Sequence, residues 1–229
     1  MSTEAHKAIA RRYWEERWNM GNVVIIGCAA VFRVVSLVSL VPLFAGILCV
    51  VPSTAEAQSP ALPPELEQVR AALDKYQDPF TAVREGYRSS VGCVEYPQGG
   101  SPGHVPYPPG GMGVHFAHVT PVGPVPDPMR PNVLVYEPDG DKLRLVAAEW
   151  LIPLATGIKE RPQLFGQPFD GPMEGHYPLQ PQGLHHYDLH VWLWKANPAG
   201  LFSPTNPTVQ CSGYGYRLPE EAPKLVPHP

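Results

Sequence analysis

The chain has 229 residues, a length that suits one domain or two small ones. Hydrophobic residues make up 44% of it and charged residues 17%, so a packed core is expected, and the net charge of −4 gives no electrostatic basis for binding nucleic acid. The 30 prolines and 21 glycines favour a domain with many turns and long ordered loops.

Residues 1–57 have the features of an export signal or a membrane anchor. Val34–Val51 carries no charge, and Ala55-Glu56-Ala57 has the form of a signal-peptidase site. If translation starts further in, for example at Met20, a secretory signal cleaved after Ala57 is expected. Otherwise residues 23–51 are long enough to stay in the membrane. Basic residues precede the apolar run, so both alternatives place the remaining chain outside the cytoplasmic membrane, in the periplasm, on the cell surface or secreted.

Cys93 and Cys211 are the two cysteines that follow this leader. Two cysteines in an oxidising compartment usually pair, so we expect a disulfide between them. It would close a loop of over a hundred residues and stabilise the fold by about 4–5 kcal/mol on the loop-entropy model. A Cys–His nucleophile is the alternative, but neither cysteine has the flanking pattern of a known thiol enzyme.

After a short Pro-rich linker at 58–64, we expect a single exported domain over 65–229. Glu65–Tyr76 is predicted to be a helix, and Asp78 is predicted to cap a second helix that runs to about Tyr87. The apolar residues of the first segment recur at helical spacing: Leu66, Val69, Leu73 and Tyr76. The two segments together predict an N-terminal helical hairpin.

Strands are expected in the rest of the domain, joined by long Pro/Gly-rich loops. The clearest pair flanks the turn Pro138–Asp141 and predicts a β-hairpin. The expected strands are Met112–Val119, Asn132–Glu137, Lys142–Ile152 and His185–Lys195. The predicted fold class is therefore α+β, with the helical hairpin followed by a mainly antiparallel β-sheet. Loops this long in a compact domain are often functional.

The last predicted strand has an unusual polar face. Successive side chains of a strand alternate between faces, so Tyr187, Leu189, Val191 and Leu193 are expected to point into the core. The opposite face would carry His186, Asp188, His190, Trp192 and Trp194. Residues four apart on a strand are separated by about 13 Å and residues two apart by about 6.6 Å. His186 and His190 therefore cannot bind one ion together, whereas Asp188 can join either of them.

Two other predicted strands offer further ligands. His115 shares a face with Gly113 and Ala117, whose small side chains leave space around an imidazole. Glu149 shares a face with four apolar residues: Leu143, Leu145, Ala147 and Leu151. A carboxylate on such a face must be paired, protonated or bound to metal if it is buried. The candidate metal site is His115, Glu149, Asp188 and His190, with His186 in reserve, and these ligands suit zinc, iron, manganese or copper.

Other interpretations of the same residues remain open. Trp192 and Trp194 are candidates for a sugar or small-ligand surface, or they cover a second core layer. The polar residues are alternatively a hydrogen-bonded network without a ligand, in which Glu149 pairs with Arg144 or with His115. The loop Leu164–His176 is a candidate lid that offers Asp170, Glu174 and His176 as extra ligands, although its glycines and prolines equally suit a structural surface loop.

Several well-defined motifs are absent from the sequence. It has no GxGxxG after a predicted strand and no GxxxxGK[ST], HExxH, CxxC or CxxCH, and its one GxSxG, Gly99–Gly103, lies in a Pro/Gly-rich stretch rather than at a strand-to-helix turn. Nucleotide binding, c-type haem attachment, thioredoxin chemistry and serine hydrolysis therefore have no support from the sequence.

Several strings of the chain resemble an uncharacterised family of exported bacterial proteins. They are DKYQDPFTAVREGY, GMGVHF, PNVLVYEPDGDKLRLVAAEWLIP, LFGQPFDGPM and HYDLHVWLWKANPAGLFSPTNP, and they span most of residues 70–211. The resemblance implies that these segments belong to one domain, and it supplies no catalytic residues.

Three functions follow as expectations. The first is an exported binding protein with a His/carboxylate metal site or small-ligand site on one sheet face. The second is a metal-dependent enzyme that uses His115, Glu149 and His190 and activates water or dioxygen. The third is an accessory subunit of a membrane complex, anchored by residues 23–51. In each case we expect no nucleic-acid partner, and membrane contact only through an uncleaved anchor.

Overall fold

The computed structural model describes residues 61–120, 122–177 and 179–228. The chain divides into two units, Met1–Ala55 and Glu56–Pro229, and every described residue belongs to the second. The predicted signal peptide, its cleavage site and the alternative anchor lie outside the described residues, so they stay predictions. Among the residues that are described, no helix is long and apolar enough to span a membrane.

A short helical region opens the described chain. It consists of α2 (Pro64–Leu73), the 3-10 helix η2 (Asp74–Gln77) and α3 (Pro79–Arg84). Asp78 caps α3, since its carboxylate accepts a hydrogen bond from the Phe80 N–H at 3.0 Å. The residues of this region that the helical spacing predicts as buried are buried: Leu66, Val69, Leu73 and Tyr76.

The helical hairpin that we expected is not confirmed. α2 leads into α3 through η2, and the helical region is short beside the β-sheet. Helix also ends earlier than expected, because α3 stops at Arg84, Gly86 takes a positive φ of 104°, and Tyr87 already begins a strand. Val83 of α3 is exposed and does not join the core. The domain is thus mainly β, with a short helical region at its start.

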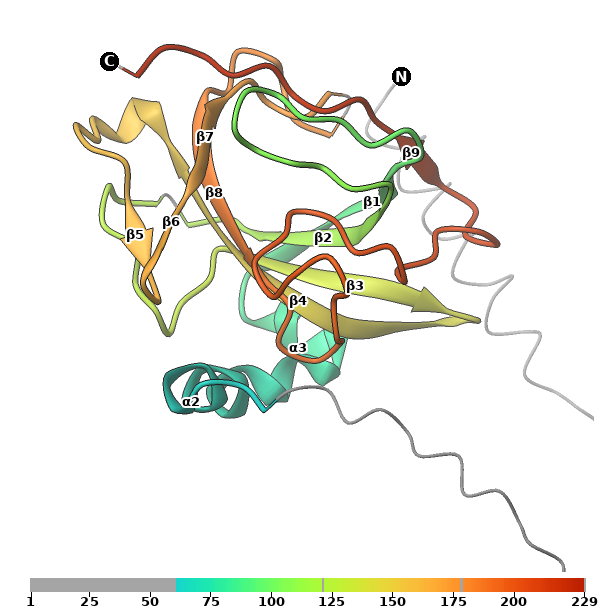
Figure 1. The fold of residues 1–229 in the computed structure, drawn as a ribbon. Coiled ribbons are helices and arrows are strands. Elements are labelled where there is room, and N and C mark those ends of the chain that lie inside the picture. The colour runs from blue at the N-terminus through green and yellow to red at the C-terminus, as the bar shows by residue number, and fades with distance from the viewer. Residues whose placement is uncertain (1–60, 121, 178, 229) are drawn as a thin grey trace, which may run out of the picture. The chain divides into compact units, whose positions relative to one another are not determined.

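One seven-stranded sheet dominates the domain (Figure 1). Its strand order is β7-β8-β4-β3-β2-β1-β9, and every neighbouring pair is antiparallel except β1 with β9. The strands are β1 (Tyr87–Tyr96), β2 (Gly110–His118), β3 (Val133–Asp139), β4 (Lys142–Pro153), β7 (Asp170–Met173), β8 (His186–Val191) and β9 (Arg217–Pro219). The elements outside this sheet are η3 (Leu154–Thr156) and the short pair β5 (Gln163–Leu164) and β6 (Gln167–Pro168).

The predicted hairpin is confirmed: β3 and β4 pair as neighbours, and the turn between them leaves Asp139 opposite Lys142. The sequence did not reveal β1, β7 or β9. β8 pairs with both β4 and β7, so it is an interior strand of the sheet rather than an edge strand. Its polar side chains therefore have a neighbouring strand on each side.

A β-bulge in β4 changes which residues lie beside Glu149. Val135 pairs with Ala147 but the next residue of β3, Tyr136, pairs with Leu145, so one extra residue of β4 interrupts the alternation. Leu145 therefore packs in the core cluster under the helices, together with Leu143. The expectation that these two leucines share the face of Glu149 is wrong.

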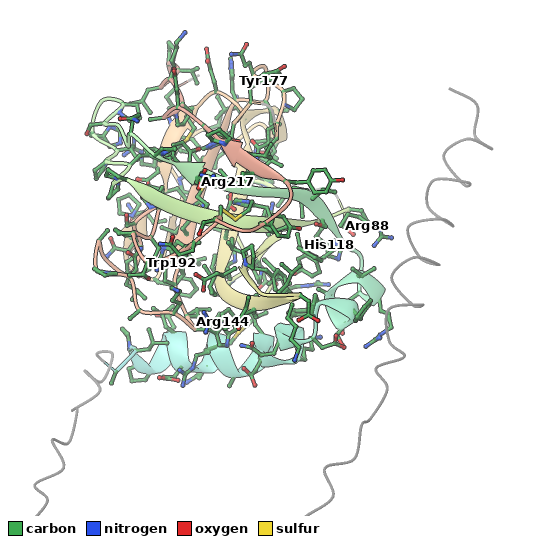
Figure 2. The ribbon with its side chains drawn as sticks, turned by 90° about the vertical axis from the view of Figure 1, so that its right-hand side faces the viewer. Arg88, His118, Arg144, Tyr177, Trp192 and Arg217 are labelled. Atoms are coloured by element: carbon green, nitrogen blue, oxygen red, sulfur yellow. A yellow bond between two sulfur atoms is a disulfide. The ribbon has the colours of Figure 1, made fainter. Side chains whose placement is uncertain are left out.

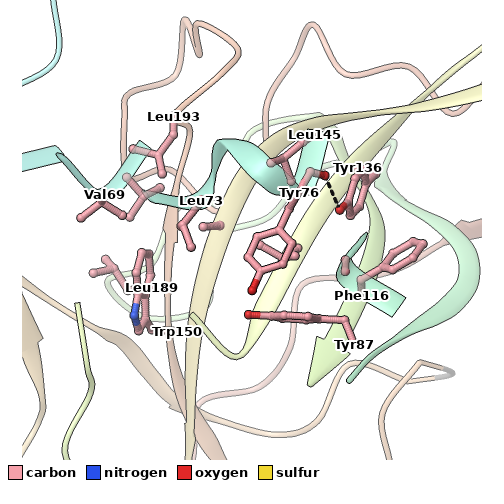
Figure 3. Packing of buried hydrophobic residues seen from close by; sticks show 14 of the residues in the cluster. Val69, Leu73, Tyr76, Tyr87, Phe116, Tyr136, Leu145, Trp150, Leu189 and Leu193 are labelled. Atoms are coloured by element: carbon pink, nitrogen blue, oxygen red, sulfur yellow. Dashed lines mark hydrogen bonds between the residues drawn. The ribbon is translucent and has the colours of Figure 1, made fainter. Parts of the chain in front are cut away.

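The sheet separates the helical region from the long loops. The main core packs the helical region against one face of the sheet, and part of it appears in Figure 3, where the Tyr136 hydroxyl donates to the Tyr76 carbonyl at 2.7 Å. The opposite face carries a smaller cluster: Val133, Val135, Val146, Ala147, Leu151, Trp192 and Val209. Loops cover this second face, and Asn206 pairs there with Gly111 of β2.

The predicted disulfide is confirmed. Cys93 in β1 is bonded to Cys211 in the loop before β9, across 118 residues of sequence, and both cysteines are buried. The bond is drawn in yellow in Figure 2. It fastens the C-terminal loops to the sheet.

Candidate metal centre

The polar face of β8 is fully buried. His186, Asp188 and His190 are each exposed by 1% or less. β4 supplies the neighbouring side chain on one side, since Glu149 lies directly opposite His190 in the β4–β8 register. β2 supplies His115, which is held opposite Val135 of β3. The three predicted β-segments therefore do converge.

His115, Glu149 and His190 form a first ligand group. The Nε2 atom of His115 lies 3.6 Å from Oε2 of Glu149, and the Nε2 atom of His190 lies 3.4 Å from the same oxygen. Each residue offers a ligand atom within 4.8 Å of the other two. Both separations are too long for a hydrogen bond.

These separations are those expected between ligands of a single ion. Two atoms bound to one zinc ion at about 2.0–2.2 Å in tetrahedral geometry lie roughly 3.3–3.6 Å apart. The group also lacks other hydrogen-bond partners, because Oε2 of Glu149, Nδ1 of His115 and both ring nitrogens of His190 have none among the described residues. Buried polar atoms without partners are rare in native proteins, and this group could hold a metal ion.

Burial sets the protonation of this group. Desolvation lowers the pKa of His115 to about 3 and that of His190 to about 4. Desolvation, together with the nearby charge of Asp188, raises the pKa of Glu149 well above its ordinary value. Without an ion, burial therefore favours two neutral imidazoles and the protonated form of the Glu149 carboxyl. A bound cation would take the place of that proton.

His176, His186 and Asp188 form a second ligand group. The Nε2 atoms of His176 and His186 each lie 3.8 Å from Oδ2 of Asp188. Burial raises the pKa of Asp188, but the imidazoles of His186, His190 and His176 outweigh it, so its pKa lies below the ordinary value. As the strand spacing predicted, His186 and His190 fall in different groups, and Asp188 groups with only one of them.

The whole first group, and His176 and Asp188 of the second, line one small cavity of about 10 Å³. That volume is close to the space that one water molecule needs. Met112 also lines it, because the positive φ of Gly113 (111°) and a register shift in the β1–β2 pairing interrupt strand alternation at this point of β2. The lining residues are Val94, Met112, His115, Glu149, His176, Leu179, Gln180, Asp188, His190 and Glu220.

A larger cavity, of about 550 Å³, lies elsewhere. Its walls include Tyr76 and Tyr87 from the main core side and His118 at the end of β2, and no member of either ligand group. Space for an organic ligand is therefore separated from the candidate metal centre.

The two tryptophans do not form the ligand surface that we considered. Trp192 is 2% exposed, and its indole N–H donates to the Ser203 carbonyl at 2.7 Å, so a loop covers it. Trp194 is half-buried against the main core and donates to Asp74 in η2. The two indoles pack in different clusters because β8 ends at Val191 and strand alternation stops there.

The candidate lid contributes one ligand of the three that we considered. His176 joins the second group and is buried, whereas Asp170 and Glu174 belong to neither group. Asp170 lies opposite Asp188 in the β7–β8 register, and burial together with Asp188 raises its pKa to about 7. Part of this segment is strand rather than loop, since β7 begins at Asp170.

Sequence reasoning missed two residues that support the second group. Tyr96, at the end of β1, and Glu220, just beyond β9, are both buried and contact His176. β1 was not predicted, and Glu220 lies in a Pro-rich tail without periodicity. No local signal in the sequence could therefore have identified either residue.

Comparisons with protein-family models, with curated proteins and with solved structures find no match for this chain. The resemblance to exported bacterial proteins accordingly stays a prediction, and the functional argument depends on the geometry of the two ligand groups.

Proposed function

We propose that this protein is an exported metal-binding protein whose first ion is held by His115, Glu149 and His190. The observation that carries the proposal is the position of Oε2 of Glu149, which lies 3.4 Å and 3.6 Å from two imidazole nitrogens and has no hydrogen-bond partner. Two imidazoles and one carboxylate suit zinc, iron, manganese or copper.

Export is supported by the disulfide and by the leader pattern. Cys93–Cys211 is compatible with an oxidising compartment. Residues 1–57 have the sequence features of a signal peptide or an anchor. N-terminal sequencing of the mature protein tests this: a chain that begins at Gln58 supports cleavage, and an intact leader on protein found in the membrane fraction supports the anchor. Protein found in the cytoplasm with its leader intact contradicts export.

Elemental analysis of protein purified without a His-tag tests the metal. We expect about one equivalent or more of a divalent transition metal per chain, and a loss of about one equivalent in the His115→Ala variant. His104→Ala is the matched control, because His104 is exposed and belongs to neither ligand group. A wild-type metal content no higher than that of His115→Ala, after equilibration with zinc, contradicts the proposal.

A metal-dependent enzyme is the second candidate, and one observation favours it. Three protein ligands leave an open position on a tetrahedral ion, which is the arrangement of catalytic rather than structural zinc sites. The adjoining cavity, about 10 Å³ in volume, has room for one water molecule there. Binding of azide to the cobalt-substituted protein, seen as a change in its visible spectrum, would support an accessible open position. An unchanged spectrum at saturating azide favours the binding protein.

The accessory-subunit hypothesis depends on residues 23–51, which lie outside the described residues. Recovery of the protein in a detergent-solubilised complex, and its release when the leader is deleted, would support that hypothesis.

A further inference from the structure

We infer that His176, His186 and Asp188 hold a second divalent transition-metal ion, so that the buried face of β8 carries a two-ion centre. This inference rests on the proposed function, because residues of both groups line the same cavity. The second site has its own ligands and its own hydrogen-bond partners, so an experiment can disprove either proposal without disproving the other.

The hydrogen bonds around His176 determine which of its ring nitrogens carries the proton and which can bind metal. The Tyr96 hydroxyl donates its single proton to Oε2 of Glu220 at 2.8 Å. Its oxygen lies 2.7 Å from Nδ1 of His176 and can therefore only accept, so Nδ1 carries the proton. The other nitrogen, Nε2, then presents a lone pair, and it lies 3.8 Å from Oδ2 of Asp188.

His186 is oriented in the same way by the backbone. Its Nδ1 atom lies 3.0 Å from the Leu184 carbonyl oxygen, which can only accept, so Nδ1 is the donor. Nε2 of His186 again presents a lone pair, it is buried, and no described group hydrogen-bonds to it. It too lies 3.8 Å from Oδ2 of Asp188. Metal-binding histidines are commonly fixed in this manner by a hydrogen bond from the second ring nitrogen.

Three acceptor atoms therefore face one another without a proton between them. Two imidazole lone pairs point toward a carboxylate that is 1% exposed, and Oδ1 of the same carboxylate also lacks a hydrogen-bond partner. Such an arrangement is repulsive unless a cation lies among the three groups. Separations of 3.8 Å are within a few tenths of an ångström of those expected between ligands of one tetrahedral ion.

The chain topology explains why two sites form rather than one. His186, Asp188 and His190 occupy alternate positions of β8, so His186 and His190 lie about 13 Å apart along the strand and bind different ions. Glu149 completes the first group from β4, and His176 completes the second from the segment after β7. Glu220 and Tyr96 support only the second group.

Zinc stoichiometry of the untagged mature chain tests this inference. After metal removal and equilibrium dialysis against zinc, we expect about two ions per wild-type chain. The double variant His176→Ala/His186→Ala should bind about one, and His115→Ala/His190→Ala should also bind about one. His104→Ala, the matched control, should bind about two.

Tyr96→Phe tests the same site if the double variant does not fold. Phenylalanine keeps the ring and removes the hydroxyl that fixes His176. Loss of such a supporting hydrogen bond typically weakens metal binding by roughly 10–100-fold. We expect that weakening for one of the two ions only, with the thermal unfolding of the metal-free protein showing that the fold is kept.

The outcomes separate the two proposals. One ion in the wild type, lost with His115 but unaffected by the His176/His186 and Tyr96 variants, overturns the second site and leaves the proposed function intact. It would then mean that a protonated imidazole, rather than a metal ion, balances Asp188. No bound ion in the wild type overturns both proposals.

Discussion

Glu137 and Glu149 are equally buried carboxylates on the same face of the sheet, but their hydrogen-bond partners differ. Each is 3% exposed. Glu137, in β3, accepts hydrogen bonds from Lys195 at 2.9 Å, from Arg144 at 2.7 Å and from the Gln210 N–H at 3.2 Å. Glu149 lies beside two imidazoles instead, and its Oε2 atom has no hydrogen-bond partner among the described residues.

Because their partners differ, the pKa values of the two glutamates shift in opposite directions. Burial acts to raise both, but at Glu137 the hydrogen bonds from Lys195 and Arg144 outweigh it and lower the pKa. At Glu149 nothing outweighs burial and the pKa rises. Arg144, which we considered as a partner of Glu149, pairs with Glu137 instead. The fold thus surrounds Glu137 with its own cations, whereas Glu149 belongs to a buried group that could hold a metal ion.

The largest expected effect is that of removing the disulfide, which lies next to one of the hydrogen-bond donors of Glu137. Gln210, which donates to Glu137, directly precedes Cys211 of the disulfide. The Cys93→Ala/Cys211→Ala variant should lose about 4–5 kcal/mol of unfolding free energy, because the unfolded chain regains the entropy of an open loop. Urea unfolding of wild type and variant measures the difference. A loss below about 1 kcal/mol would mean that the loops hold Glu137 without the bond.

Glu137→Gln should destabilise the protein by about 2–3 kcal/mol. The carboxamide keeps the shape of the side chain but loses the charge that Lys195 and Arg144 share, and charged hydrogen bonds of buried groups are worth this much. Because Arg144 is half exposed and can be rehydrated, the lower part of the range is expected. Chemical unfolding at neutral pH gives the value. No loss would contradict the view that these cations compensate the buried carboxylate.

The same interaction predicts a dependence of stability on pH. The folded-state pKa of Glu137 lies below its ordinary value of 4.5, so its contribution is fully present above pH 4.5 and is lost as the pH falls through the lowered folded-state pKa. Unfolding free energies measured across this acid range should fall more steeply for wild type than for Glu137→Gln. Parallel curves for the two proteins would contradict the assignment.

Glu149→Gln should have the smallest effect on the metal-free protein, less than about 1 kcal/mol. A protonated carboxyl and a carboxamide have nearly the same shape, and neither carries a charge. The matched substitution at Glu137 therefore serves as its control, in the same sheet and at the same exposure. Zinc binding to the first ligand group should nevertheless be lost, as equilibrium dialysis would show. A destabilisation equal to that of Glu137→Gln would mean that Glu149 is ionised and paired without metal.

The sequence by itself predicted the features that depend on the spacing or the type of individual residues. Strand alternation separated the core residues of β8 from His186, Asp188 and His190, and the same spacing predicted that the two histidines belong to different ligand groups. The β3–β4 hairpin followed from its turn, and the disulfide followed from the two cysteines after the leader.

Only the tertiary structure decided which groups meet across the sheet. The bulge in β4 moved Leu143 and Leu145 away from Glu149, and the end of β8 placed Trp192 and Trp194 in separate clusters. His176, Tyr96 and Glu220 meet although up to 124 residues separate them along the chain. Alternation is a property of neighbouring residues, so sequence reveals it. The closing of long loops depends on the packing of the whole domain, and no short stretch of sequence encodes it.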